Sequence, residues 1–236
     1  MVAVRLKDLK NKSRIILALD DPGKLKEKKL LTNIANEVAG VKIGLPLVLS
    51  RESSDIINTL SDAGAYILAD FKLADIPYVM IKTIEGIMDY VNGVISHAFI
   101  GREAIAQLLE FLRKHEIELF LVVAMTHKGA EEFINSLAEK FIHIARELGV
   151  SGVVAPATFP EKICLARNLL GDAIILSPGV GAQGAEVGSA IKHGADFEII
   201  GRLITESENP LVEVNRINRI HLSILSSLNS NYRKFS

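Results

Sequence analysis

Residues Tyr66 to Pro77 read Tyr-Ile-Leu-Ala-Asp-Phe-Lys-Leu-Ala-Asp-Ile-Pro. The segment begins as an apolar run of the kind that forms a buried strand, and it ends in charged residues. Because side chains alternate between the two faces of a strand, Asp70 and Lys72 share one face, and Asp75 follows in the connecting turn. Proline suits the first turn of a helix. The segment therefore predicts a strand followed by a helix, with a lysine between two carboxylates where the strand ends.

The same alternation of strand and helix recurs along the whole chain. Short runs of Val, Ile and Leu are almost continuously apolar, as strands covered on both faces must be, and each precedes a longer amphipathic stretch. The runs predict strands at Arg14–Asp20, Gly40–Gly44, Tyr66–Phe71, Gly93–Ala98, Leu119–Met125, Gly152–Ala155, Ala173–Ser177 and Phe197–Gly201. Helical spacing of apolar residues is clear at Leu47–Ala63, Gly101–His115 and Glu131–Gly149.

About eight strand–helix units in a chain of this length predict an α/β fold, a single-domain (β/α)8 TIM barrel that spans residues 1–236. A doubly wound open sheet also alternates strand and helix. We disfavour it because no G-x-G-x-x-G follows the first strand and polar residues follow nearly every strand. The polar residues 228–236 are expected to fray beyond a final helix.

Composition limits the class of protein. The 236 residues are 49% hydrophobic and 23% charged, with a formal net charge of -1 and no basic block, so no nucleic-acid partner is expected. The apolar runs are shorter than the ~18 residues of a membrane helix, and the first residues are too polar for a signal peptide. A single cysteine excludes an internal disulfide and suits a reducing compartment. We therefore expect a soluble, cytoplasmic protein.

Charged residues gather at the carboxyl ends of the first three predicted strands. Asp20 ends the first strand, Lys42 lies in the second, and Asp70 and Lys72 lie in the third, with Asp75 just beyond. In a barrel, these strand ends face the active site. Because isolated buried charges are costly, we expect the side chains to pair in the order Lys42–Asp70–Lys72–Asp75. A structural ion pair would not require so many charges at one rim.

The second half of the sequence predicts an anion site. Ser177-Pro178-Gly-Val-Gly-Ala-Gln183-Gly follows the seventh strand, and Gly201-Arg202 follows the eighth. Loops at these two places commonly bind phosphate in barrels, and a guanidinium can bind it in a fork. Thr126, after the fifth strand, could offer a hydroxyl and a backbone N–H to a polar ring edge. His97, after the fourth strand, is expected to be a rim histidine with its hydrogen bonds satisfied, not a catalytic one.

Five segments together resemble one known family, orotidine 5′-monophosphate decarboxylase, over almost the whole chain. They are Leu-Ala-Leu-Asp20, Val-Lys42-Ile-Gly, Asp70-Phe-Lys72-Leu-Ala-Asp75-Ile-Pro, Ser-Pro178-Gly-Val-Gly-Ala-Gln183-Gly and Gly201-Arg202. The D-x-K-x-x-D-I-P string is highly specific when it occurs in this order with the phosphate loop. The resemblance implies a homodimeric barrel that converts orotidine 5′-monophosphate to UMP, the last step of UMP synthesis, with no metal or organic cofactor.

The resemblance also implies a role for each matching residue. Lys72 would protonate C6 of the pyrimidine as carbon dioxide leaves, and Asp70 would lie against the substrate carboxylate. Lys42 would hold Asp70 and a ribose hydroxyl, and Asp20 would also bind the ribose. Further implied substrate contacts come from Thr126 at the pyrimidine edge, Pro178, and the phosphate-binding Gln183, Gly201 and Arg202.

The implied homodimer would share its sites between subunits, because Asp75 and Ile76 are expected to reach into the neighbouring pocket. Two positions depart from the family's usual pattern. Thr126 stands where serine is common, which keeps the hydroxyl. Val79 stands where a threonine often contacts ribose, so that contact is not expected here.

Three other functions fit parts of the pattern. Sugar-phosphate decarboxylases of related barrels share the D-x-K-x-x-D string but bind Mg²⁺ through a carboxylate on the second strand, where this chain has Lys42. A non-catalytic nucleotide-binding barrel would need no lysine between carboxylates. A Schiff-base aldolase would need a neutral lysine, which flanking carboxylates oppose.

Overall fold

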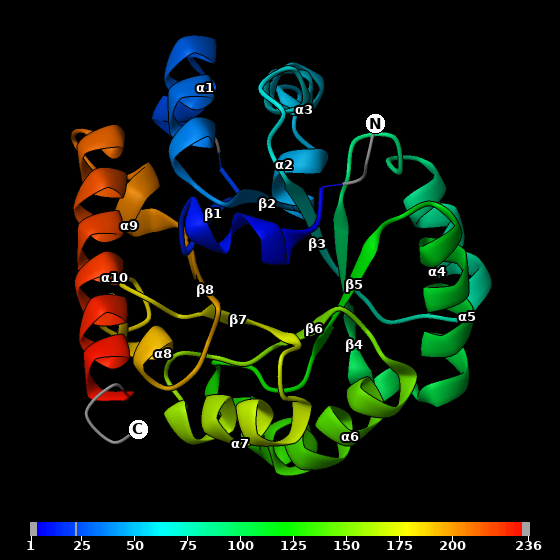
Figure 1. Cartoon of the computed structure of the whole chain (residues 1–236). Helices are drawn as coiled ribbons and strands as arrows, with labels where there is room; N and C mark the ends of the chain where they lie inside the picture. Colours follow the sequence, from blue (N-terminus) through cyan, green and yellow to red (C-terminus); the bar gives the residue numbers. More distant parts are fainter. Residues whose placement is uncertain (1–3, 22, 233–236) are drawn as a thin grey trace.

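The computed structural model describes residues 4–21 and 23–232 and shows eight parallel strands closed into a barrel, each paired with the next and β8 paired with β1 (Figure 1). The (β/α)8 prediction is therefore confirmed. The strands are β1 (Ile15–Leu19), β2 (Gly40–Gly44), β3 (Ile67–Leu73), β4 (Gly93–His97), β5 (Glu118–Val122), β6 (Gly152–Val154), β7 (Ile174–Pro178) and β8 (Phe197–Ile200). Each expected strand is present with its ends within a few residues of the prediction.

Helices surround the barrel, as Figure 1 shows. The α-helices are α1 (Lys28–Glu37), α2 (Leu45–Val48), α3 (Ser53–Asp62), α4 (Pro77–Glu85), α5 (Arg102–Lys114), α6 (Ala138–Leu148), α7 (Pro160–Leu170), α8 (Ser189–Lys192), α9 (Arg202–Thr205) and α10 (Pro210–Tyr232). Short 3₁₀ helices are η1 (Leu6–Asn11), η2 (Gly23–Lys26), η3 (Ala98–Ile100), η4 (Lys128–Glu132) and η5 (Asn135–Leu137). Among the described helices, none has the length and apolar character needed to span a bilayer.

The hydrophobic residues form two buried layers. Side chains such as Leu68, Phe120 and Phe197 fill the inside of the barrel, and a larger set lies between the strands and the helices. This arrangement accounts for the nearly continuous apolar runs, since alternate residues of each strand are buried on opposite faces.

One mouth of the barrel is closed by the N-terminal segment. η1, dark blue in Figure 1, crosses that mouth with the Leu6 side chain fully buried. The Leu6 N–H donates to the buried Glu118 carboxylate at 2.8 Å, and the Tyr66 hydroxyl donates to the same oxygen at 2.9 Å. The carboxyl ends of the strands, at the opposite mouth, are therefore left to form a site.

Two predicted helices differ from those observed. The stretch Leu47–Ala63 is not one helix: α2 ends in a tight turn, where the Ser50 N–H bonds to the Leu47 carbonyl, and α3 begins at Ser53. Serine hydroxyls compete with helical backbone bonds and favour such breaks. The stretch Glu131–Gly149 is helical only from Ala138, because η4 and η5 fold its first part back toward β5.

The ends of the other predicted helices agree closely with the structure. Gly64 and Gly149 follow α3 and α6 with φ angles of 64°, which glycine adopts without strain. At the C-terminus, α10 continues to Tyr232, so the expected frayed tail is helical at its start. Residues 233–236 of that tail lie outside the described residues.

Candidate active site

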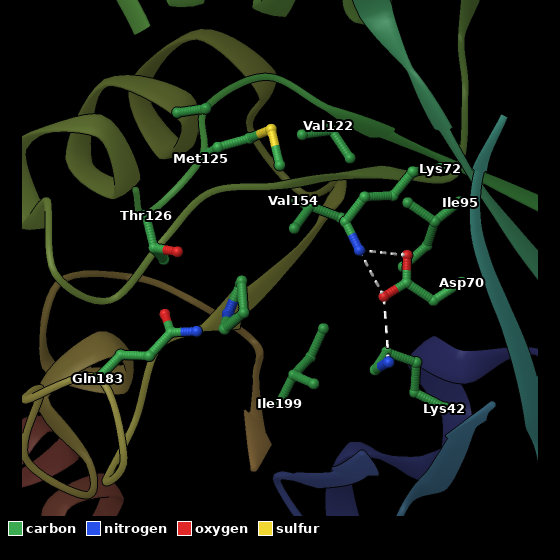
Figure 2. Close-up of a pocket in the computed structure, with 12 residues that line it drawn as sticks. Lys42, Asp70, Lys72, Ile95, Val122, Met125, Thr126, Val154, Gln183 and Ile199 are labelled. Atoms are coloured by element: carbon green, nitrogen blue, oxygen red, sulfur yellow. Dashed lines mark hydrogen bonds and ion pairs between the residues drawn. The ribbon is translucent and has the colours of Figure 1, made fainter. Parts of the chain in front are cut away.

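Four charged side chains form a continuous row at the carboxyl ends of β1, β2 and β3. The Lys42 ammonium lies 2.9 Å from an Asp20 carboxylate oxygen and 3.1 Å from an Asp70 oxygen. The same Asp70 oxygen lies 2.9 Å from the Lys72 ammonium. The order is therefore Asp20–Lys42–Asp70–Lys72, with Asp70 between the two lysines in Figure 2.

Burial makes the middle of this row depend on its partners. The Lys42 and Asp70 side chains are 7% and 8% exposed. Burial alone would lower the pKa of Lys42, but the adjacent Asp70 and Asp20 carboxylates outweigh it and raise that pKa above its usual value. Burial would likewise raise the pKa of Asp70, and Lys42 and Lys72 outweigh it and lower that pKa. Both groups are therefore charged near neutral pH.

Asp75 does not join the row, which corrects the predicted Lys42–Asp70–Lys72–Asp75 order. Within the described chain, no ion pair joins Asp75 to Lys72; the Asp75 carboxylate instead accepts the Ile76 N–H at 2.7 Å. Both residues are exposed, Ile76 at 61%. They lie between the end of β3 and the start of α4, and neither lines the pocket of its own barrel.

An irregularity in β3 explains how Lys72 reaches Asp70. Ala69 pairs with Val94 and Leu73 pairs with Ser96, so the three residues 70–72 stand opposite one residue of β4. Lys72 has a φ angle of 44°, a conformation that non-glycine residues rarely adopt. Such bulges bend a strand and redirect its side chains. The bulge therefore turns Lys72 back toward the carboxylate two residues before it.

The bulge is held by a buried hydroxyl from the next strand. Ser96 of β4 is fully buried, and its Oγ donates to the Leu73 carbonyl at 2.8 Å. This bond occupies the carbonyl immediately after Lys72. A backbone conformation as unfavourable as that of Lys72 persists only where its surroundings hold it, and it is commonly found at functional sites.

The glycine-rich loop predicted to bind an anion, residues 177–184 and called here the anion loop, lies across the pocket from the row of charges. Between β7 and α8, the Gly181 N–H bonds to the Ala185 carbonyl at 2.8 Å, and the Ala185 N–H bonds back to Gly179 at 3.3 Å. Gly179, Gly181 and Gly184 all have positive φ angles. This compact loop, together with the start of α9, lines the same cavity as the charged row: Asp20, Lys42, Asp70, Lys72, Pro178, Gln183, Gly201 and Arg202.

An apolar wall completes the pocket. The inward-facing side chains of Ile95, Val122, Val154 and Ile199 line it together with Met125 and Thr126 (Figure 2). Figure 2 places Thr126 and Gln183 on the opposite side of the pocket from Asp70 and its lysines. Sequence reasoning missed the apolar wall. Its only signal was the alternation of strand residues, which marks inward positions but does not separate a pocket wall from the barrel core.

His97 lies beside the pocket and is not fully hydrogen-bonded. Its ring packs on Phe99 with centroids 4.7 Å apart, and its buried Nδ1 atom has no hydrogen-bond partner among the described residues. Burial, helped by the Lys72 ammonium, lowers the pKa of His97 to about 4. The ring is thus neutral near pH 7, and the expectation that its hydrogen bonds are satisfied is wrong for Nδ1.

Nine of the eleven predicted site residues line this pocket, and Asp75 and Ile76 do not. A row of fixed charges, an apolar wall and a glycine-rich loop at the carboxyl end of a (β/α)8 barrel are features of enzymes that act on small molecules, and the sequence predicts that the loop binds a phosphate. Residues 13–217 match the model of the Orotidine 5'-phosphate decarboxylase / HUMPS family. The chain belongs to this family.

Individual relatives agree with this assignment. The chain is 36% identical over 211 residues to orotidine 5'-phosphate decarboxylase of Methanococcoides burtonii, with 89% of this chain and 97% of that protein covered. A crystal structure of orotidine 5'-monophosphate decarboxylase from Sulfolobus solfataricus superposes with a TM-score of 0.84 at 36% identity, covering 91% of this chain and all of that one. The Methanocaldococcus jannaschii enzyme, complexed with the inhibitor BMP, gives a TM-score of 0.80 at 30% identity, covering 88% and 98%.

Proposed function

We propose that this chain decarboxylates orotidine 5′-monophosphate to UMP and carbon dioxide in pyrimidine biosynthesis, without a metal or organic cofactor. The observation that carries the proposal is the Asp20–Lys42–Asp70–Lys72 row, which faces an apolar wall and lies across the pocket from the anion loop. The names of the relatives support the same substrate.

Lys72 is proposed as the proton donor. When the bond between C6 and the carboxylate breaks, the electron pair stays on C6, and the ring cannot delocalise it. An ammonium aimed at that carbon stabilises charge that exists only as the transition state forms, and such stabilisation raises the rate. Lys72 then transfers its proton to C6, which gives UMP.

Asp70 and Lys42 are proposed to act through charge and position. Asp70 would lie against the substrate carboxylate, where like charges repel until carbon dioxide departs. Lys42 is buried between Asp70 and Asp20, so it fixes the Asp70 carboxylate and leaves Asp20 near the ribose. The apolar side chains Ile95, Val122 and Val154 would surround the departing neutral carbon dioxide.

The phosphate is proposed to lie between the loop around Gln183 and the N-terminal end of α9, at Gly201 and Arg202. The Arg202 guanidinium can bind two phosphate oxygens in a fork. Binding energy gained there, far from C6, can drive closure of the loop and assemble the reactive arrangement.

Lys42 argues against the magnesium-dependent alternative. A divalent cation at this rim would need the carboxylates of Asp20 and Asp70, and the Lys42 ammonium contacts both at about 3 Å. A cation would be repelled by that ammonium. The raised pKa of Lys42 also opposes a Schiff-base role, which needs a neutral amine.

A spectrophotometric assay with orotidine 5′-monophosphate, run with and without a chelator, tests the proposal. We expect consumption of the substrate and equal rates in both conditions. Loss of activity on chelation, restored by Mg²⁺, would support the magnesium-dependent barrel instead. Binding of UMP with no consumption of orotidine 5′-monophosphate would support the non-catalytic nucleotide-binding barrel.

A further inference from the structure

The Asn135 side chain makes three hydrogen bonds, two of them to Met125, which lines the pocket. The residue is 1% exposed. Its side-chain Oδ1 accepts the Met125 N–H at 2.8 Å, and its Nδ2 donates to the Met125 carbonyl at 3.1 Å and to the Glu131 carboxylate at 2.7 Å. The amide can point only one way, because turning it over would face its NH₂ group toward the Met125 N–H.

Met125 lies beyond the end of β5, so its backbone N–H and C=O are not paired with a neighbouring strand of the described chain. The ladder between β5 and β6 ends at Val122 with Val154, and the last backbone bond to the sheet comes from the Val123 N–H. The Asn135 amide therefore offers Met125 the donor and acceptor that an adjacent strand would otherwise supply. Met125 and the next residue, Thr126, both line the pocket, on the side where the pyrimidine edge is proposed to lie.

Asn135 is itself held from two directions. It begins η5, the second of the two turns that bring the chain back to β5. The Lys162 ammonium, from α7, donates to the Asn135 backbone carbonyl at 3.2 Å. The side chain thus connects a fixed turn to the end of β5 and fixes where Met125 and Thr126 lie.

We propose that Asn135 is a positioning residue for recognition of the pyrimidine ring, an inference that rests on the proposed function. It acts through the Met125–Thr126 peptide and does not touch the substrate. Among the hydrogen bonds of the described residues, those of Asn135 go to Met125, Glu131 and Lys162, and none goes to Gln183, Gly201 or Arg202, the residues proposed to hold the phosphate. Removal of Asn135 should therefore weaken binding of the ring and leave binding of the phosphate almost unchanged.

Two ligands separate these contributions. UMP carries ring and phosphate, and ribose 5-phosphate carries only the sugar and the phosphate. For Asn135→Leu, which keeps a similar volume without hydrogen bonds, we expect UMP to bind at least about tenfold more weakly, since two buried backbone groups lose their partners. Ribose 5-phosphate should bind within about twofold of wild type. Titration calorimetry with each ligand measures both affinities.

Asn92→Leu is the matched control. Asn92 is also a partly buried amide that bonds to a strand backbone: it directly precedes β4 and accepts the N–H of Ile67, the first residue of β3, at 2.8 Å. Both residues lie at the amino ends of their strands, at the opposite mouth of the barrel from the pocket. The control should reduce stability without changing the ratio of the two affinities. A similar loss for both ligands in Asn135→Leu, or no loss for either, would overturn the positioning role.

A second pair of variants covers the case in which Asn135→Leu does not fold. Asn135→Asp keeps an acceptor for the Met125 N–H, but it loses the bonds donated to the Met125 carbonyl and to Glu131, and it faces Glu131 with a like charge. Adding Glu131→Gln restores a donor to the new carboxylate, so UMP affinity should recover in the double variant while ribose 5-phosphate affinity stays constant. No recovery would contradict the proposal. These binding assays need no turnover, so a chain that binds UMP but leaves orotidine 5′-monophosphate intact would overturn the proposed function alone.

Discussion

Lys72 and Arg202 lie at opposite ends of the proposed substrate, and their replacement should affect different kinetic constants. Lys72→Ala removes the proposed proton donor and the positive charge proposed to stabilise the carbanion, so we expect kcat to fall by at least about 10³. Arg202→Ala removes a proposed phosphate contact that would be made in ground and transition states alike, so KM should rise about 10- to 100-fold with a smaller change in kcat. Steady-state assays with orotidine 5′-monophosphate measure both. Intact turnover in Lys72→Ala would rule out the assigned donor.

His97 should make the protein less stable in mild acid. The pKa of His97 is lowered from 6.5 to about 4 in the folded state, chiefly by burial. Between those two values the unfolded chain binds a proton that the folded chain does not, so stability rises with pH through this window and is lost as pH falls. With an allowance for partial solvent screening, the loss at pH 5 relative to pH 8 should be about 1 to 2 kcal/mol.

Urea unfolding at the two pH values measures this effect. Carboxylates elsewhere also titrate toward acid, so the informative quantity is the difference between wild type and His97→Gln, which has no imidazole to protonate. We expect the variant to lose less stability than wild type between pH 8 and pH 5. An equal loss in both proteins would show that His97 titrates normally.

At the residue scale, sequence reasoning predicted the charged row well and its surroundings poorly. The four charged residues of the row, Asp20, Lys42, Asp70 and Lys72, were predictable. Charged side chains at the carboxyl ends of apolar barrel strands face the same mouth of the barrel, where they must pair with one another. Asn135 was not predictable, because a single asparagine in a polar loop carries no sign that its side chain bonds to Met125, ten positions earlier. The apolar wall could not be predicted, because the same types of residue, at the same alternate strand positions, form both a pocket wall and the barrel core.

At the element scale, the bulge in β3 was the main feature that the sequence did not reveal. Asp70 and Lys72 were expected to share a face through simple alternation, and they do pair, but through a strand that carries extra residues and a positive φ angle at Lys72. The Ser96 hydroxyl, from another strand, donates to the Leu73 carbonyl at the end of the bulge. Contacts between distant segments of this kind cannot be read from the local pattern of either segment.

The pairing of β6 with β7 leads to a stability prediction. A Cβ atom added at Gly152 would clash with the backbone carbonyl of Ile174 on β7, and a backbone carbonyl cannot move aside like a side chain. Gly152→Ala should therefore reduce the free energy of unfolding by about 2 to 3 kcal/mol.

Gly86→Ala is the control for this substitution. Gly86 follows α4 with a φ angle of -71°, and an added Cβ would meet only the Thr83 carbonyl at 3.7 Å. Alanine should be neutral there or stabilise by about 0.5 kcal/mol, because it restricts the unfolded chain. Thermal or urea unfolding of both variants tests the pair. Equal stability of Gly152→Ala and wild type would mean that β6 and β7 are farther apart than described.

At the scale of the whole molecule, the barrel was predictable because the strand–helix pattern repeats so many times that an error in one unit does not change the outcome. The surroundings of Asp75 were less predictable, because the family resemblance implies that this residue reaches into the pocket of a second chain. Large apolar side chains are exposed along the loops that follow β2 to β5. They include Leu49 at 81%, Ile76 at 61%, Tyr78 at 68%, Phe99 at 51% and Phe133 at 71%. These strands are adjacent in the barrel, so the side chains lie on one part of the rim, as expected for the homodimer that the family resemblance implies.

A mixing experiment tests whether each pocket of that dimer takes Asp75 from the partner subunit. Lys72→Ala and Asp75→Ala should each be nearly inactive alone. In a mixed dimer, the pocket that keeps Lys72 would receive an intact Asp75 from the other chain, while the second pocket would lack both. Random exchange of equal amounts therefore predicts about one quarter of wild-type activity, since half of the dimers are mixed and each has one working pocket. If Asp75 served its own chain, every pocket would lack one residue, and mixing would restore nothing.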